Sequence, residues 1–276
     1  MAGVVRGLQE RAARALPAES VSYADGWWLR HDSGSSWWVA SVLPHGPEEP
    51  ARPARRVSHA EAFYAGHGAA ARFQITPGAC PAGLDDLLAR RGYRRSGPVS
   101  LQTAAVADVP RPRAGERLRV RTGDRPDDAW FGVWHAVHGG DAGAERSRLD
   151  RVAGPSAYVR VLDGDAPVAV GRAVADTGWA GVFHLATLPA ARGRGAAGRV
   201  LGALAGWAGA QGATGLYLQV ERDNPAALRL YARAGFRELC TYHYRTAAWR
   251  PARPAPDNGA GGVGQVDEGA GDEQQQ

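Results

Sequence analysis

The chain has 276 residues, a hydrophobic share of 44% and nine tryptophans. This length and apolar content suffice for buried cores and suit one large or two small domains, of which two is the expectation. The formal net charge is +5, every basic residue is an arginine, and no run of them resembles a nucleic-acid-binding arm. Because a basic surface favours anionic partners in general, charge alone does not choose between a nucleic acid and a small anionic ligand.

The cysteines and the apolar runs argue against several classes of protein. Cys80 and Cys240 are the only cysteines and lack metal-ligand spacing, so neither a disulfide framework nor a zinc site is expected. Segment 1–20 carries charges throughout, unlike a signal peptide, and no stretch reaches the roughly 18 uncharged apolar residues of a membrane span. The prediction is a cytoplasmic protein that binds neither membrane nor nucleic acid and holds no metal.

The first half of the chain alternates predicted helices and strands. Strand-like runs at 25–32 and 35–43, separated by Ser33 and Gly34, predict a hairpin. The other elements are helix 8–16, a proline-rich link 44–54, helix 57–68, strand 71–75, helix 83–93 and strand 99–104. Four tryptophans on the hairpin either pack across its strands or form one wall of a binding site; they are Trp27, Trp28, Trp37 and Trp38.

A proline-bearing linker at 108–116 precedes the second half of the chain. That half is predicted to contain strand 117–123, helices 127–138 and 145–153, and strands 157–162, 166–174 and 179–188. Glycines 198, 202 and 206 lie four apart on the next helix, and close packing on the sheet is expected to offset their low helix propensity. Segment 250–276 is rich in Pro, Gly, Asp, Glu and Gln and predicts a disordered tail.

The most informative stretch runs from Leu185 to Ala197, LATLPAARGRGAA. A buried strand ends at Pro189, and after a glycine-bearing turn the apolar spacing is that of a helix reaching about Gln211. The first turn of such a helix leaves its N–H groups unpaired, with the positive end of the helix dipole behind them, which suits a diphosphate. Glycine permits close approach and positive φ, and arginine adds charge; these residues are Arg192, Gly193, Arg194 and Gly195.

A second motif follows at 224–236, NPAALRLYARAGF. Asn224 is expected to cap a helix and Gly235 to close its far end. Together with RxxGxA at 192–197 and the intervening strand 215–220, this pattern resembles the GNAT superfamily of acyl-CoA-dependent N-acyltransferases. The resemblance implies a mixed, mostly antiparallel sheet flanked by helices, with acetyl-CoA as cosubstrate.

The chain also resembles two copies of one unit. SVLP at 41–44 corresponds to ATLP at 186–189, FQI at 73–75 to LQV at 218–220, and LARRGYRR to YARAGFRE. The first copy has GPEEPAR in place of the arginine and glycine loop, and its two acids repel a phosphate while its two prolines lack N–H donors. The predicted fold is therefore α/β (α+β), with a degenerate GNAT-like unit at 1–107, a linker at 108–116, a catalytic unit at 117–249 and the tail at 250–276.

The resemblance also implies which residues form the site. Backbone groups of the central strand would hold the thioester carbonyl and the pantetheine arm. Tyr231 occupies the tyrosine position of the second motif and would act as general acid to the CoA sulfur; the alternative is a core tyrosine. The cofactor-binding residues implied are Ala186, Thr187, Leu188, Arg192, Gly193, Arg194, Gly195, Ala196, Ala197, Asn224 and Tyr231.

The acceptor amine needs a route for its proton. An alkylamine of pKa ~10.4 is deprotonated at pH 7 at a cost of about 4.6 kcal/mol, so a nearby base should help. His184, inside the central strand, and Glu221, at the end of the next strand, are the candidates; a buried hydrogen-bonded histidine and a solvated acid are the alternatives. His135 and His138 lie three apart on a helix, but without a third ligand nearby they predict no metal site.

Two classes of function remain open from the sequence. The first is an N-acetyltransferase that uses acetyl-CoA and a primary amine of a small molecule, a peptide or a protein terminus. The second is a non-catalytic regulator that binds acyl-CoA. The intact loop and Tyr231 favour the enzyme. The pocket for the acceptor is expected to involve the helix pair around 128–152 and the first unit.

Overall fold

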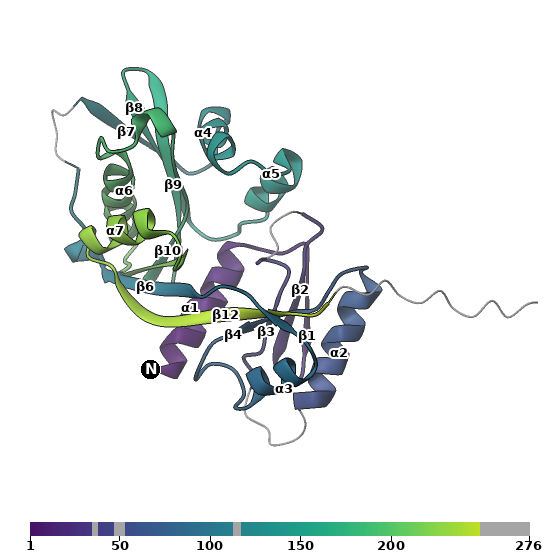
Figure 1. Ribbon diagram of the computed structural model, residues 1–276. Helices are drawn as coiled ribbons and strands as arrows, with labels where there is room; N and C mark the ends of the chain where they lie inside the picture. The colour runs from purple at the N-terminus through teal and green to yellow at the C-terminus, as the bar shows by residue number, and fades with distance from the viewer. Residues whose placement is uncertain (35–37, 47–52, 113–116, 249–276) are drawn as a thin grey trace, which may run out of the picture.

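The computed structural model describes residues 1–34, 38–46, 53–112 and 117–248 (Figure 1). The predicted tail at 250–276, Trp37, positions 47–52 of the acidic loop and positions 113–116 of the linker lie outside the described residues. Within those residues, every helix is too short or too polar to cross a lipid bilayer.

In Figure 1 the elements form two lobes, one around each half of the chain. The helices are α1 (Ala2–Ala15), α2 (Pro53–Gly66), α3 (Leu84–Arg90), α4 (Asp128–His138), α5 (Ala142–Asp150), α6 (Ala196–Ala210) and α7 (Pro225–Arg233), with 3-10 turns η1 (Val106–Asp108) and η2 (Pro189–Ala191). The strands are β1 (Ser20–Ala24), β2 (Trp27–His31), β3 (Val42–Leu43), β4 (Arg72–Ile75), β5 (Arg94–Arg95), β6 (Val99–Ala105), β7 (Leu118–Gly123), β8 (Ser156–Asp163), β9 (Ala166–Asp176), β10 (Trp179–Thr187), β11 (Gly215–Glu221) and β12 (Arg237–Thr246).

Side-chain caps fix where three helices of the second lobe begin. Asp127 accepts a hydrogen bond from the Trp130 N–H at 2.8 Å, and Asp141 and Asn224 make the equivalent bond at the starts of α5 and α7. Each cap satisfies one of the N–H groups that a helix start leaves unpaired. The predicted capping role of Asn224 is therefore confirmed by its bond to the Ala227 N–H at 3.0 Å.

The strands form one mixed sheet in the order β1-β2-β3-β4-β12-β6-β11-β10-β9-β8-β7, and β5 pairs with β12 beside this path. Most neighbours are antiparallel, whereas β3 with β4 and β10 with β11 are parallel. Each lobe therefore contains one parallel pair of strands. These pairs, β3 with β4 and β10 with β11, contain the segments that the sequence repeat aligns with each other. The predicted fold class, a mixed and mostly antiparallel sheet flanked by helices, is confirmed.

Helices cover both faces of the second lobe's sheet (Figure 1). One face packs under α6 through Val200, Leu204 and neighbouring apolar side chains. The other packs under α4, where Trp130 lies against Tyr158 with ring centroids 5.2 Å apart. On β9, Ala169 belongs to the core under α6 and the next residue, Val170, to the core under α4, as the two-residue period of a strand requires.

The two lobes exchange strands. β6 follows the helices of the first lobe but lies between β11 and β12, and its Leu101 stands opposite Gln219 on one side and Cys240 on the other. β12 begins beside β6 and ends beside β4, where Tyr244 stands opposite Gln74. The long ribbon of β12 crosses from one lobe to the other in Figure 1. The predicted division into two units at residue 107 stays a prediction. Strands from before and after this boundary are hydrogen-bonded to each other.

The predicted pairing of runs 25–32 and 35–43 is confirmed, because β2 and β3 are antiparallel neighbours, but it is short and a second hairpin precedes it. The tight turn lies at Asp25 and Gly26, both with positive φ, and joins β2 to β1, a strand that the sequence reading did not assign. Ser33 and Gly34 instead begin a longer connection to β3, which pairs with β2 over only two described residues. An Asp-Gly pair is a strong turn signal, so this turn is readable from the sequence.

The glycines of α6 do not pack as expected. A Cβ on Gly202 would meet the Pro110 carbonyl oxygen at 2.4 Å, and one on Gly206 would meet the Arg111 guanidinium at 2.6 Å. The small size of these glycines therefore leaves room for Pro110 and Arg111, which lead into the second lobe. It does not serve close packing of α6 on the sheet. A Cβ on Gly198 would meet nothing within 4 Å.

Candidate active site

The site begins where the two parallel strands of the second lobe stop pairing. The ladder between β10 and β11 runs only from Trp179 opposite Gly215 to Gly181 opposite Tyr217. On its other side β10 has a bulge between Phe183 and Ala186. His184 lies in this bulge with φ of +54°, a conformation that a non-glycine residue adopts at a cost. The bulge and the lost pairing free backbone groups of β10 for other partners.

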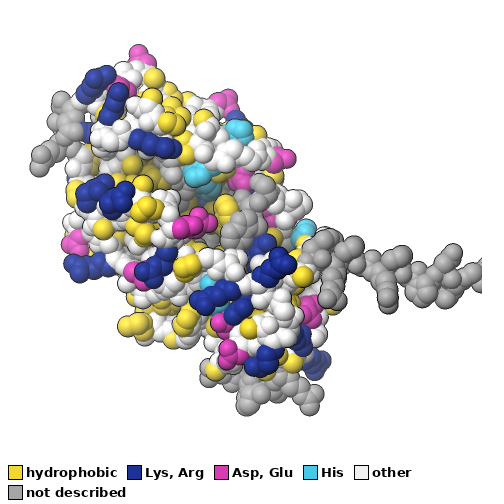
Figure 2. All heavy atoms as spheres, viewed as in Figure 1, with side chains coloured by type: hydrophobic (Ala, Val, Ile, Leu, Met, Phe, Trp, Pro, Cys, Tyr) yellow, Lys and Arg dark blue, Asp and Glu magenta, His cyan; other side chains and the backbone are white. Residues whose placement is uncertain are grey.

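A cavity of about 1410 Å³ opens at this point. A pocket for one small ligand usually measures about 300–1,000 Å³, so the space suits two molecules side by side. In Figure 2 arginine side chains surround a central region, between the two lobes, where hydrophobic and histidine side chains lie. Eleven of the predicted site residues line the cavity; they are His184, Ala186, Thr187, Arg192, Gly193, Gly195, Ala196, Ala197, Glu221, Asn224 and Tyr231.

One end of the cavity is built by the loop before α6. Gly193 and Gly195 have φ of +76° and +79°, and Gly195 is the cap residue of the helix. A Cβ at either position would meet nothing within 4 Å, so the backbone there faces open space. The first-turn N–H groups of α6 have no partner within the helix and are available to an anion. Arg192 adds charge and donates a hydrogen bond to the Thr187 carbonyl at 3.4 Å.

Two predicted cofactor-binding residues do not line this cavity. Leu188 packs partly buried against the core under α4, and its N–H donates to the Val168 carbonyl at 2.9 Å. Arg194 turns to the other side of the loop, where its guanidinium lies 3.3 Å from the Asp163 carboxylate. The sequence indicates where these residues lie along the chain, but it does not indicate the direction of their side chains.

Tyr231 lies on α7 at the boundary between core and cavity. Its side chain is 8% exposed and packs edge to face against Phe236 at 5.9 Å. Burial raises the pKa of Tyr231 to about 12. Tyr231 is therefore a core tyrosine that also lines the cavity, and its role as general acid stays a prediction. Its hydroxyl is protonated throughout the neutral range.

The two candidate bases lie on neighbouring strands. Glu221 is exposed at the end of β11. His184 is half-buried, packs edge to face against Trp134 at 5.3 Å, and has a buried Nδ1 without a hydrogen-bond partner. Burial first, and the positive charge of Arg172 second, hold the pKa of His184 well below its usual 6.5. The imidazole is therefore neutral at neutral pH.

Three aromatic side chains from different elements also line the cavity, and of these only Tyr242 was not considered for the site from the sequence. Trp134 comes from α4, Trp38 from the first lobe, and Tyr242 from β12, where its hydroxyl donates to Gln219 at 2.9 Å. Trp38 is 44% exposed. The alternating aromatics of β12 were a readable strand signal that was not used. His138 also lines the cavity, and no group of three metal ligands occurs among the described residues.

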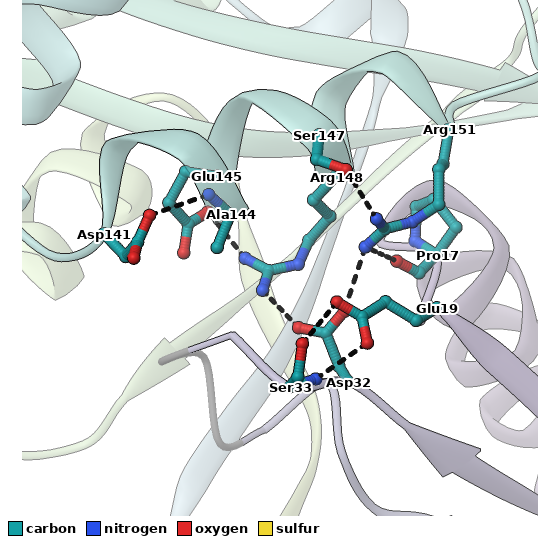
Figure 3. A network of polar contacts seen from close by, with 10 residues as sticks. All are labelled: Pro17, Glu19, Asp32, Ser33, Asp141, Ala144, Glu145, Ser147, Arg148 and Arg151. Carbon is teal, nitrogen blue, oxygen red and sulfur yellow. Dashed lines mark hydrogen bonds and ion pairs between the residues drawn. The ribbon is translucent and has the colours of Figure 1, made fainter.

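A buried network of charges joins the wall of the cavity to the first lobe (Figure 3). Arg148 on α5 binds the Glu145 carboxylate at 2.6 Å and also the carboxylate of Asp32, which follows β2. Arg151 lies 2.9 Å from the other Asp32 oxygen. The side chains of Asp32, Arg148 and Glu145 are only 1%, 3% and 5% exposed. Because Glu145 lines the cavity, the first lobe fixes part of its wall.

Asp32→Asn is expected to lower the free energy of unfolding by about 2 kcal/mol, because the buried guanidinium of Arg148 loses one of its two carboxylates. Urea denaturation measures this change. The matched control is Asp25→Asn, the same substitution at an exposed turn position, which should shift stability by less than about 0.5 kcal/mol. Equal midpoints for the two variants would contradict a stabilising role for the network.

Solved structures identify the fold. A GCN5-related N-acetyltransferase from Kribbella flavida is similar with a TM-score of 0.69 and 17% identity, over 89% of this chain and 95% of that one. A tandem GNAT protein from the clavulanic acid biosynthesis pathway is similar with a TM-score of 0.62 and 14% identity, over 91% of this chain and 89% of that one. The fold is therefore that of GNAT acetyltransferases.

Sequence comparison identifies the family. The family described as "probable histone acetyltransferase Rv0428c C-terminal" matches residues 2–245, and the chain belongs to it. An uncharacterized N-acetyltransferase of Bacillus subtilis, YobR, is 27% identical over 252 residues, which are 87% of this chain and 98% of that protein. The protein is an N-acetyltransferase of the GNAT superfamily, as the two motifs predicted.

Proposed function

We propose that this enzyme transfers an acetyl group from acetyl-CoA to the primary amine of a small molecule, a peptide or a protein terminus. The observation that carries the proposal is that the glycine-flanked start of α6 and Tyr231 open into the same cavity. The open space at Gly193, Gly195 and Gly198 suits a diphosphate approaching the backbone. Bound acetyl-CoA would supply the thioester, a carbonyl carbon that an amine can attack.

In the proposed reaction the amine nitrogen bonds to the carbonyl carbon, the carbon–sulfur bond breaks, and one proton passes from nitrogen to sulfur overall. Ala186 and Thr187, beside the bulge of β10, orient the carbonyl through backbone groups. The cap Asn224 lies in reach of the pantetheine arm as well as its own helix.

Tyr231 donates a hydrogen bond to the departing sulfur. Full transfer from a hydroxyl of pKa about 12 to a thiolate of pKa ~8.5 is uphill by roughly 5 kcal/mol. The hydroxyl therefore stabilises the developing charge more than it surrenders its proton. Because the pKa is raised, the proton needed for that bond is present at every physiological pH.

We propose His184 as the group that accepts the amine proton, directly or through water, with Glu221 as the second candidate. The strained φ of His184 supports this choice, since such strain is retained where it serves a site. Its neutral imidazole has a lone pair to offer. Glu221 lines the same cavity but lies exposed at a strand end.

His184→Asn is expected to lower kcat by about 100-fold at pH 7 with unchanged affinity for CoA, since Asn tolerates the positive φ but is no base. The wild-type kcat/KM should rise with pH over about pH 6.5 to 8.5, because the small neutral fraction of an amine of pKa ~10.4 grows about tenfold per pH unit while the histidine is already neutral. Steady-state kinetics measure both. A larger loss in Glu221→Gln than in His184→Asn would assign the proton to the glutamate.

The proposed function is tested by thiol release from acetyl-CoA against a panel of primary amines. We expect release to depend on an amine and to be matched by acetylated product in mass spectrometry. Tight CoA binding without turnover on any amine would contradict the proposed reaction. We also propose that the first unit, 1–107, shapes the acceptor pocket while the second, 117–249, binds the donor, in line with the placement of Trp38 and Asp32.

A further inference from the structure

A second, smaller cavity of about 280 Å³ lies on the other side of the loop that precedes α6. It is lined by Arg117, Leu118, Asp163, Arg194 and Arg199. Among the described residues, three arginines and one aspartate contribute to this lining. The volume is below the usual range of about 300–1,000 Å³ for a whole ligand, and it suits one end of a larger molecule.

The arginines of this cavity are held by the fold. Arg117 binds Asp163 at 2.8 Å and Arg194 binds the same carboxylate at 3.3 Å, so one acid orients two cations. Arg199, on the first turns of α6, is 9% exposed and donates to the Leu118 carbonyl at 3.2 Å. Guanidinium groups fixed in this way are suited to bidentate contact with phosphate oxygens.

The position of the cavity relates it to the donor site. Arg194 stands between Gly193 and Gly195, and both glycines line the large cavity. The loop thus borders both spaces. In coenzyme A the ribose carries its 3′-phosphate only a few bonds from the diphosphate, and such a monoester has a charge of about −2 at neutral pH. Arginine side chains are suited to bind such a group through paired N–H donors.

We infer that the cavity bounded by Arg117, Arg194 and Arg199 binds the 3′-phosphate of coenzyme A, an inference that rests on the proposed use of acetyl-CoA. The enzyme thereby distinguishes coenzyme A from acyl carriers that have the same pantetheine arm but lack this phosphate. The diphosphate binds at the start of α6, and the smaller cavity binds the nucleotide end of the donor.

The test is calorimetric titration of the full chain with CoA and with 3′-dephospho-CoA at low ionic strength, where exposed charges are least screened. Wild type should bind CoA about 10- to 100-fold more tightly. Arg117→Gln and Arg199→Gln should each reduce this ratio while leaving the affinity for 3′-dephospho-CoA within about twofold. The Arg117 side chain is 80% exposed, so its replacement leaves the folded core intact.

The matched control is Arg121→Gln, an exposed arginine on the same strand, β7, that does not line the cavity. It should keep the wild-type ratio. Equal affinity of wild type for the two molecules, or a ratio that survives in both cavity variants, overturns the inference and leaves the proposed function standing. Failure of wild type to bind either molecule overturns both.

Discussion

Gly195→Asp is expected to weaken CoA binding by at least about 100-fold. The residue lies at φ of +79° at the start of α6, and a Cβ there would project into open space. The added carboxylate would therefore face the proposed diphosphate position. Two like charges 4 Å apart repel by about 4 kcal/mol at an effective dielectric constant of 20, which corresponds to more than a hundredfold in affinity. Calorimetry with CoA measures the loss.

Gly195→Asn is the matched control for this charge. Asparagine has the same size as aspartate and also tolerates a left-handed backbone, so it tests the cost of the side chain without the charge. We expect a reduction of no more than about tenfold in this variant. Equal affinity of the two variants for CoA would show that the added carboxylate meets no repulsion. The diphosphate would then not bind at this loop.

Tyr231→Phe is expected to lower kcat by about 100-fold or more and to leave the Kd of CoA unchanged. The phenyl ring keeps the contact with Phe236, so only the hydrogen bond to the departing sulfur is lost. Because the pKa of Tyr231 is about 12, wild type and variant should show parallel pH profiles through the neutral range. Single-turnover kinetics with saturating acetyl-CoA isolate the affected step.

Tyr217→Phe provides the comparison for a buried hydroxyl that does not line the cavity. Its kcat should stay within about twofold of wild type. An unaltered rate in Tyr231→Phe, or an equal loss in the two variants, would contradict the assignment of Tyr231 to the leaving group.

The sequence predicted those parts of the site that are carried by local chemistry. The capping role of Asn224, the left-handed glycines of the loop and the helix after them follow from short-range rules, and the structure has all three. The direction of Arg194 depends instead on Asp163, which lies on another strand and is distant in sequence. Local patterns carry no information about such a partner.

The aromatic wall of the cavity was predicted only in outline, as helices 128–152 and the first unit, and not residue by residue. It combines Trp38, Trp134 and Tyr242, which come from three elements of both lobes. The network of Asp32 with Arg148 joins residues that are 116 positions apart in the chain. Only the strand exchange brings these segments together, and the sequence reading did not assign β12.

Strand β12, which pairs with strands of both lobes, also determines when the sheet can be completed during protein synthesis. β12 supplies a neighbour to β4 in the first lobe and to β6 in the second, yet it follows every other described strand in the chain. During synthesis the edges of β4 and β6 that β12 covers therefore stay unpaired until residues 237–246 have been made. Neither half would form a complete sheet by itself, because each half contributes a strand to the sheet of the other lobe.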